Sequence, residues 1–404
     1  MAAHVYSIAM PAPHSAPSLD AHTTREILDR LVSFDTTSRN PNRDLIDWIA
    51  AWLLQRGVEA EILPDAGGGK ANLHAVIGPR GPGGLALSGH VDTVPVDGQA
   101  WSSDPFTLRE ANGRLHARGA VDMKGFVASA LACVPDLLER RLHRPVHLFV
   151  TYDEEVNCAG ATALVAHLDA TGDKPDWCVV GEPSGMKPIV AHKGRLSLRV
   201  RVRGKAGHSS QPEFGANAIH AAARAVARVA DEQDRLAREG VRVDGFDPPF
   251  STTHVGTISG GAILNIIPES AEFDMEWRTV PGDDALAELT RLQDHVARHI
   301  EPALKAGGGS GFVYEILNEL PPLSLPPGHA LAQSVRHASG HNAEGRVSYG
   351  TEAGIYQNAG IATIVCGPGH IAQAHQPDEW IAVSELEACD VFLRRLVDST
   401  VARA

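Results

Sequence analysis

The sequence predicts an α/β protein of two domains, in which a smaller α+β domain is inserted into a mixed-sheet domain. Three observations support this fold class. The chain has 404 residues, enough for two hydrophobic cores. Its first half alternates helix-like and strand-like patterns, whereas its middle third begins with a strand of half-exposed character. An apolar run like those of the first half then returns near the C-terminus.

The larger domain is predicted from two helices, four strands and a later helix. Apolar residues recur every three or four positions at 24–34 and 44–57, which is typical of amphipathic helices. Four short, almost continuously apolar runs have the composition of strands buried on both faces of one sheet. These runs occupy residues 84–89, 146–152, 176–181 and 362–369. A further helix is predicted at 126–138.

The middle segment has the element order β-α-β-β-α-β. Residues 194–207 alternate basic and apolar side chains, as a half-exposed strand does. The elements that follow are predicted at 217–240, 251–261, 271–280, 284–300 and 311–317. This order is that of a ferredoxin-like arrangement. We therefore predict an inserted domain at 193–319, a discontinuous larger domain at 20–192 and 320–404, and a loose N-terminal arm at 1–19.

Composition restricts the classes of partner. The formal net charge of -13 argues against nucleic acid or an anionic membrane surface. No segment approaches the roughly 20 apolar residues of a membrane span, and the N-terminus lacks the pattern of a signal peptide. The five cysteines are scattered and include no C-x-x-C pair, so no disulfide framework is expected. We expect a cytoplasmic protein that binds a small molecule.

Acidic residues and histidines follow the predicted strands. They are His90 and Asp92, Glu154 and Glu155, Glu182 and, one loop after the last strand, His375. Asp122 lies in a glycine-flanked turn before a predicted helix, where an aspartate is often only a helix cap. Each residue alone has such an ordinary explanation. Their shared position beyond the carboxyl ends of strands, where ligands bind in open α/β sheets, indicates one common site.

The charges of this set suit two divalent metal ions. Asp122, Glu155 and Glu182 carry three negative charges, and His90 and His375 bind metal as neutral imidazoles. Two Zn²⁺ ions and one hydroxide would make the cluster neutral, which lowers the cost of burying it. Without metal, the carboxylates would repel one another. Mixed N/O donors suit Zn²⁺, with Co²⁺ or Mn²⁺ as substitutes, and Asp122 is the natural bridge.

Neighbouring glutamates at a strand end can have different roles, because their side chains point in different directions. We expect Glu155 to bind metal and Glu154 to act as the general base and then the general acid. Zinc lowers the pKa of bound water to about 7, so such a base has an easily ionised water to act on. Asp92, two residues after His90, is placed to fix the tautomer of that imidazole.

Five motifs in this order resemble those of the di-zinc aminoacylase and glutamate-carboxypeptidase family of amidohydrolases. They are "SGHVDTVP", "RGAVDMKG", "DEEV", "GEPS" and "AHQPDE", and the resemblance extends from about residue 23 to the C-terminus. It implies that His90 and Glu182 hold one zinc, that Glu155 and His375 hold the other, and that Asp122 bridges. It also implies that the inserted domain is a lid and the dimerisation surface of a homodimer.

The same resemblance implies further site residues outside the metal motifs. His208 in "AGHSS" would reach the active site of the partner subunit and stabilise the oxyanion. Arg278 in "EWRTVPG" and Asn265 in "LNIIP" would contact the substrate carboxylate. Arginine suits this contact because its planar fork pairs with a carboxylate bidentately. Gly350 and Thr351 in "YGTEAG" are expected to be further substrate contacts.

Longer motifs narrow the expected substrate. "GEPSGMKPIVAHKG", "GKAGHSSQPEFGANAI" and "CGPGHIAQAHQPDEW" are similar to those of family members that deacetylate N²-acetyl-L-ornithine in arginine biosynthesis. We therefore expect zinc-dependent hydrolysis of the amide of an N-acetyl amino acid. Succinyl-diaminopimelate desuccinylases, aminoacylases and carboxypeptidases would use the same cluster and stay as alternatives. His370 departs from the small polar residue common after "GPG", which leaves the side-chain specificity open.

Other classes of protein fit less well. No G-x-G-x-x-G opens a helix after a strand, which argues against a dinucleotide-dependent oxidoreductase. No G-x-S-x-G elbow is present for a serine hydrolase. A binding protein that keeps the cleft without catalysis would typically have lost a ligand or the base, and all of them are present here.

Overall fold

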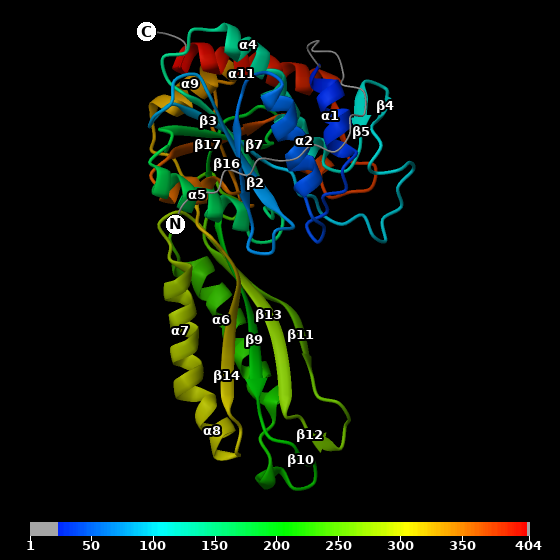
Figure 1. Cartoon of the computed structure of the whole chain (residues 1–404). Helices are drawn as coiled ribbons and strands as arrows, with labels where there is room; N and C mark the ends of the chain where they lie inside the picture. Colours follow the sequence, from blue (N-terminus) through cyan, green and yellow to red (C-terminus); the bar gives the residue numbers. More distant parts are fainter. Residues whose placement is uncertain (1–22, 402–404) are drawn as a thin grey trace.

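The computed structural model describes residues 23–401 and confirms the predicted fold class. Figure 1 shows a compact α/β lobe and, extending from it, an elongated lobe of strands β9, β11, β13 and β14 covered by helices. The elongated lobe is formed by the middle of the chain, so the chain leaves the first lobe and returns to it. The predicted arm at 1–19 lies outside the described residues.

The main sheet is mixed, with parallel strands at its centre. The central strands are β6 (Val146–Thr151), β3 (Leu85–His90), β7 (Trp177–Pro183) and β17 (Ala362–Gly367), and they run parallel in that order. The flanking strands are β1 (Ala60–Pro64), β2 (Ala71–Ile77), β8 (Ile189–His192), β15 (Leu323–Ser324) and β16 (Gly345–Val347). The complete order is β1-β2-β6-β3-β7-β17-β8-β15, with β16 beside β8.

Helices cover both faces of this sheet, because side chains on each central strand alternate between two cores. Leu87 belongs to one buried cluster, whereas the preceding Ala86 belongs to the other. The first face carries α1 (Thr24–Val32), α2 (Arg43–Leu54), α3 (Gly125–Ala132), α4 (Val134–Glu139), α9 (Ala330–Ser339) and α11 (Val383–Thr400). The second face carries α5 (Ala159–Thr171) and α10 (Ala353–Asn358).

The single helix predicted at 126–138 is wrong. The structure has two helices there, α3 and α4, which meet at Cys133. Pro135 lies in the first turn of α4. A proline is tolerated in a first turn, where the missing N–H would have no helical partner, but it disrupts a helix interior. The proline therefore starts a second helix instead of continuing the first.

The inserted unit has the predicted ferredoxin-like order. Its strands are β9 (Gly194–Arg203), β11 (Thr252–Gly260), β13 (Ser270–Thr279) and β14 (Gly311–Leu320), arranged as β11-β13-β9-β14. Its helices are α6 (Ala218–Glu239), α7 (Ala285–His299) and α8 (Glu301–Ala306). Alternate residues of β9, such as Leu198 and Val200, are fully buried against the helices. We keep 193–319 as the proposed domain boundary.

Short elements complete the two lobes. The pair β10 (Gly207–His208) and β12 (Ile266–Ile267) lies at the far end of the inserted unit (Figure 1). In the main lobe, β4 (Arg109–Ala111), β5 (Arg114–His116) and β18 (Trp380–Ala382) form a three-stranded sheet. All five cysteines are free and buried. Among residues 23–401, no helix combines the length and apolarity needed to cross a bilayer.

Candidate active site

The parallel central strands bring five predicted metal ligands to one edge of the sheet. His90 ends β3, and Glu182 is the second-to-last residue of β7. Glu155 follows β6, and His375 lies in the loop after β17. Asp122 lies in the segment Ala120–Lys124 that leads into α3, and its own backbone angles there are not helical. Carboxyl ends of parallel strands meet at the same edge, so residues far apart in sequence become neighbours.

These residues form two donor clusters that share Asp122. One contains His90, Asp122 and Glu182, and the other contains Asp122, Glu155 and His375, with the donor atoms of each within 4.8 Å of one another. His90 Nε2 lies 3.1 Å from Asp122 Oδ1 and 3.7 Å from Glu182 Oε1. His375 Nε2 lies 3.2 Å from Asp122 Oδ2 and 3.0 Å from Glu155 Oε1. The two oxygens of Asp122 therefore face different clusters.

The electrostatics of the clusters fit divalent cations. Burial raises the pKa of Glu182 well above its usual range, and repulsion from Asp122 and Glu154 adds to the effect. Glu182 Oε1 is buried and has no hydrogen-bond partner among residues 23–401. A buried, orphaned carboxylate oxygen is costly unless something positive binds it. Imidazole nitrogens and carboxylate oxygens are donors that suit a divalent transition metal, so this donor set fits two such ions.

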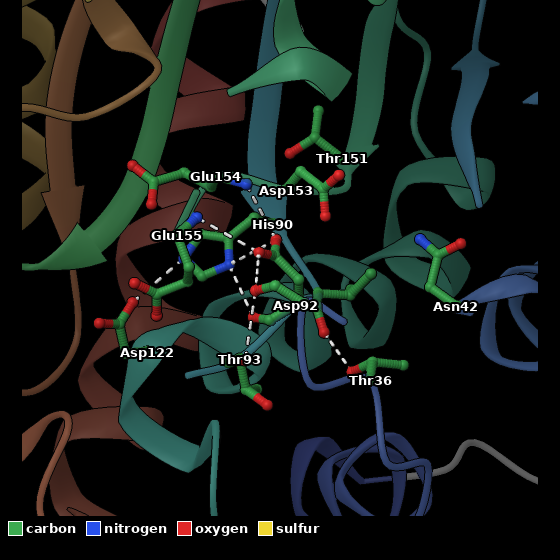
Figure 2. A network of polar contacts seen from close by, with 12 residues as sticks. Thr36, Asn42, His90, Asp92, Thr93, Asp122, Thr151, Asp153, Glu154 and Glu155 are labelled. Atoms are coloured by element: carbon green, nitrogen blue, oxygen red, sulfur yellow. Dashed lines mark hydrogen bonds and ion pairs between the residues drawn. The ribbon is translucent and has the colours of Figure 1, made fainter. Parts of the chain in front are cut away.

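Asp92 positions both the histidine and the glutamate pair. His90 Nδ1 lies 3.0 Å from the Asp92 carbonyl oxygen and 3.4 Å from Asp92 Oδ1, so the imidazole N–H points at this residue. The same carboxylate accepts hydrogen bonds from the backbone N–H groups of Glu154 and Glu155, at 3.1 and 3.2 Å. Figure 2 shows these bonds converging on Asp92. The contact between Asp92 and His90 was predicted from the sequence, but the hydrogen bonds from the backbone of Glu154 and Glu155 to Asp92 were not.

Glu154 differs from its neighbour in its surroundings. It contributes no donor to either cluster of the described residues, yet its side chain lines the same cavity. Burial raises the pKa of Glu154 well above its ordinary value, and repulsion from Glu155 and Asp122 adds to this. A carboxylate with a raised pKa is a stronger base than an ordinary one. This is the chemistry expected of a general base that later acts as an acid.

Sequence reasoning missed Glu379 and Arg118, which hold the Asp122 turn. Glu379 Oε1 accepts hydrogen bonds from the backbone N–H groups of Val121 and Asp122, at 2.9 and 3.3 Å. Its other oxygen accepts a bond of 2.7 Å from Arg118, and both side chains are buried. The only signal in the sequence is that Glu379 follows the motif of His375. Its contact with Asp122 depends on the tertiary fold.

A cavity of about 260 Å³ opens beside the clusters. Besides the acidic residues and His375, its lining includes Arg195, Arg278, Asn318, Tyr349 and Gly350. Both arginines come from the inserted unit, where they are directly opposite each other on β9 and β13. Arg278 and Gly350 were expected from the sequence, whereas Arg195 was not. Thr351 is buried, and its hydroxyl oxygen accepts a bond from the Ala353 N–H, so it supports the start of α10.

Two predicted residues lie far from this cavity. His208 is on β10, and the Ser209 N–H donates to the Asn265 carbonyl oxygen at 3.1 Å. Figure 1 shows β10 at the tip of the elongated lobe, away from the main sheet. A larger cavity of about 660 Å³ lies there, lined by residues such as Ser209 and Leu264, with no acidic side chain. Within one chain, the structure does not bring His208 or Asn265 to the clusters.

His370 does not line the cavity. Its side chain is 60% exposed, with Nε2 lying 3.5 Å from Glu385 Oε1. The next residue, Ile371, lines the cavity instead. The departure noted in the sequence therefore does not place a titratable group in the cavity, and Ile371 supplies an apolar wall.

Comparisons with known proteins agree with this architecture. Residues 86–399 match the model of peptidase family M20/M25/M40. An acetylornithine deacetylase of Photorhabdus laumondii is 37% identical over 365 residues, which cover 90% of this chain and 92% of that protein. An M20 family metallo-carboxypeptidase from Sulfolobus solfataricus has a similar fold, with a TM-score of 0.71, 18% identity, and 93% and 98% of the two chains covered. A dinuclear metal-binding peptidase of the M20 family from Bacillus subtilis also has a similar fold, with a TM-score of 0.63 and 16% sequence identity. The match covers 92% of this chain and 96% of that chain.

Proposed function

The chain belongs to peptidase family M20/M25/M40 and is a metal-dependent amidohydrolase. From this premise we propose that it hydrolyses the amide of N²-acetyl-L-ornithine to acetate and L-ornithine, using two zinc ions. This reaction would serve arginine biosynthesis in the cytoplasm. The observation that carries the proposal is the pair of donor clusters sharing Asp122 beside a cavity lined by Arg278. The relative that is 37% identical, an acetylornithine deacetylase, supports the choice of substrate.

The two metal positions follow from the donor clusters. His90 and Glu182 would hold one ion, Glu155 and His375 the other, and Asp122 would face both. When bound, zinc supplies Lewis-acid polarisation of the amide carbonyl and a water of lowered pKa. Cobalt or manganese would substitute, because both accept the same nitrogen and oxygen donors. The M20 family peptidase of Bacillus subtilis is described as dinuclear, which supports the count of two.

Glu154 would move the proton during hydrolysis. Its carboxylate accepts a proton from the water that attacks the acetyl carbonyl, and it later donates that proton to the departing amine. The hydrogen bond from the Glu154 backbone N–H to Asp92 holds the backbone of Glu154 in place, and this limits where its carboxylate can lie. Asp92 thus positions both the base and, through His90, one donor cluster. Positioning of this kind is worth much in catalysis, because the reacting groups need not search for their geometry.

Arg278 is placed to bind the α-carboxylate of the substrate. It lines the cavity, and its Nε donates to Glu276 Oε1 at 2.9 Å, which orients the guanidinium group. A bidentate pair with a carboxylate is shorter and stronger than a neutral hydrogen bond.

Replacing Arg278 by alanine is expected to lower kcat/KM for N²-acetyl-L-ornithine about 30- to 160-fold, the equivalent of about 2–3 kcal/mol for a charge-assisted contact. Arg278→Lys keeps the charge but loses the fork, so its loss should be intermediate. Arg199→Ala is the matched control, because Arg199 pairs with Asp274 on the same face of the sheet and does not line the cavity. Unchanged steady-state kinetics in Arg278→Ala would exclude the carboxylate role.

We further propose that the enzyme is a homodimer in which His208 of one subunit completes the site of the other. His208 is on β10 and does not line the cavity beside its own clusters, and Figure 1 shows β10 at the end of the inserted unit that points away from the main sheet. Large apolar side chains near this tip are exposed, including Ile263, Leu264 and Ile266. Exposed apolar groups of this kind are typical of interaction surfaces. In the partner's site, His208 would stabilise the oxyanion that forms on the acetyl carbonyl.

Mixing two inactive variants tests this exchange. His208→Ala and Glu154→Gln each damage one contribution to a site, and a mixed dimer contains one site with both contributions intact. Because half of a random 1:1 mixture is mixed dimer, about a quarter of the sites should regain wild-type turnover. The measurement is kcat after unfolding and refolding the two variants together and, as the control, separately. A mixture no more active than the sum of its parts would contradict action between subunits.

A desuccinylase acting on succinyl-diaminopimelate is the second candidate. Arg195 and Arg278 both line the cavity, so the site presents two cations to the substrate. Two arginines can pair with two of the three carboxylates of N-succinyl-L,L-diaminopimelate. Comparing kcat/KM for N²-acetyl-L-ornithine, N-succinyl-L,L-diaminopimelate and simple N-acetyl amino acids separates these candidates. A preference for the succinylated substrate would overturn the deacetylase proposal while leaving the metal centre in place.

A further inference from the structure

A second group of metal-binding side chains lies at the edge of the main sheet, apart from the active site. Glu61 on β1, His74 on β2 and His167 on α5 each offer one donor atom, and these atoms lie within 4.8 Å of one another. Glu61 and His74 are direct partners in the antiparallel β1–β2 ladder, so their side chains share a face. His167 approaches that face from α5, and its Nε2 lies 2.8 Å from Glu61 Oε2.

A chain of hydrogen bonds determines which ring nitrogen of a neutral His74 carries the hydrogen. The Gly83 carbonyl oxygen can only accept, so His147 Nε2, at 3.2 Å, carries the hydrogen. His147 Nδ1 therefore has a lone pair and accepts from His74 Nε2, at 3.0 Å. This leaves Nδ1 of a neutral His74 without a hydrogen.

This arrangement is the one that metal-binding histidines use. Such a histidine donates its second ring N–H to a fixed acceptor, which orients the ring and leaves the other nitrogen for the metal. Here the fixed acceptor is His147, which is itself held by the backbone. His74 and His147 are both buried, at 3% and 1% exposure, so the relay is rigid. These hydrogen bonds leave Nδ1 of a neutral His74 with a lone pair that can bind a metal ion.

The side chains of Glu61 and His167 are partly exposed, so they can rotate to bind an ion. The side chain of Glu61 is 52% exposed and that of His167 is 22% exposed, which also gives an ion a path from solvent. Zinc bound tetrahedrally at about 2.1 Å separates neighbouring donors by about 3.4 Å. The present separations, from 2.8 Å to at most 4.8 Å, bracket that value. Small rotations of two partly exposed side chains are sufficient.

We propose that Glu61, His74 and His167 form a metal site, separate from the active site, for a divalent first-row transition metal such as Zn²⁺. Two imidazoles and one carboxylate match the donors that such ions prefer, and a water takes the fourth position. The bound ion joins strand β1 at the sheet edge to helix α5. Its role is structural, because binding to the folded state alone stabilises that state.

Zinc stoichiometry tests this site in the full-length protein. Wild type, Glu61→Gln, His167→Gln and the control His341→Gln are dialysed against buffered free Zn²⁺, and bound zinc per chain is measured by atomic emission. His341 is an exposed histidine outside the cluster. Wild type and the control should bind one zinc more than the other two variants. Equal zinc content in all four proteins would overturn the proposal. Because the readout is a difference, it holds whatever number of ions the active site takes.

Anomalous diffraction from zinc-soaked crystals locates the additional ion. The proposal predicts a peak between Glu61, His74 and His167 in wild type that is absent from His167→Gln. A wild-type crystal with no peak between these three residues would overturn it. The two substituted side chains are partly exposed, so both variants are expected to fold, and their circular dichroism melting curves verify this.

Discussion

Glu154→Gln is expected to lower kcat for N²-acetyl-L-ornithine by about 10²- to 10⁴-fold, the usual contribution of a positioned general base. Glutamine keeps the shape and the backbone hydrogen bond to Asp92 but can neither accept nor return the proton. Because Glu154 is not a member of either donor cluster, metal content and KM should remain near the wild-type values. Steady-state kinetics and metal analysis of the same preparation measure both.

The neighbouring carboxylate provides the control. Asp153 forms an ion pair with Lys70 and belongs to neither donor cluster. Asp153→Asn should therefore retain its metal and most of its kcat. If Glu154→Gln kept more than a tenth of wild-type kcat, or lost metal along with activity, the assignment of Glu154 as the base would be wrong.

Asp122→Asn is expected to have the second large effect, at least about 10³-fold in kcat, because metal chemistry contributes several kcal/mol of transition-state stabilisation. The two carboxylate oxygens of Asp122 face His90 and His375, respectively. An amide offers one oxygen and an NH₂ group, so it cannot serve both sides. Atomic emission should show that one or both active-site ions are lost.

Asp92→Asn is the comparison for Asp122→Asn, because Asp92 is proposed to position other residues, whereas Asp122 is proposed to bridge the two metal ions. Its carboxylate contacts the backbone of the glutamate turn, so the loss should be smaller, about 10- to 100-fold, with metal retained. Asp122→Asn that keeps both ions and more than a tenth of kcat would remove Asp122 from its proposed bridging position.

The central strands of the fold could be predicted to within about two residues. Strands β3, β6, β7 and β17 are short apolar runs buried on both faces, and such runs differ clearly from their surroundings. The edge strand β1 was not predicted, because it is half-exposed and shows no clear alternation. The break between α3 and α4 was also missed, although Pro135 was a local signal for it.

The sequence could predict those residues of the candidate site that lie at the ends of strands. Residues such as His90 and Glu182 end neighbouring parallel strands, so their convergence follows from the sheet. Glu379 could not be found in this way, because it reaches the backbone of Asp122 across 257 residues of sequence. Arg195 was missed because an arginine on an alternating strand is usually an exposed residue. The role of His208 stays a prediction, since within one chain this residue, on β10, does not line the cavity beside the clusters.

The measurement that tests the central claim most directly is amine release from N²-acetyl-L-ornithine by the full-length enzyme after metal removal with a chelator. We predict no turnover by the stripped protein and recovery when Zn²⁺ is added back, with Asp122→Asn failing to recover. Turnover that is equal before and after stripping, or that zinc does not restore for any N-acyl amino acid, would contradict the account.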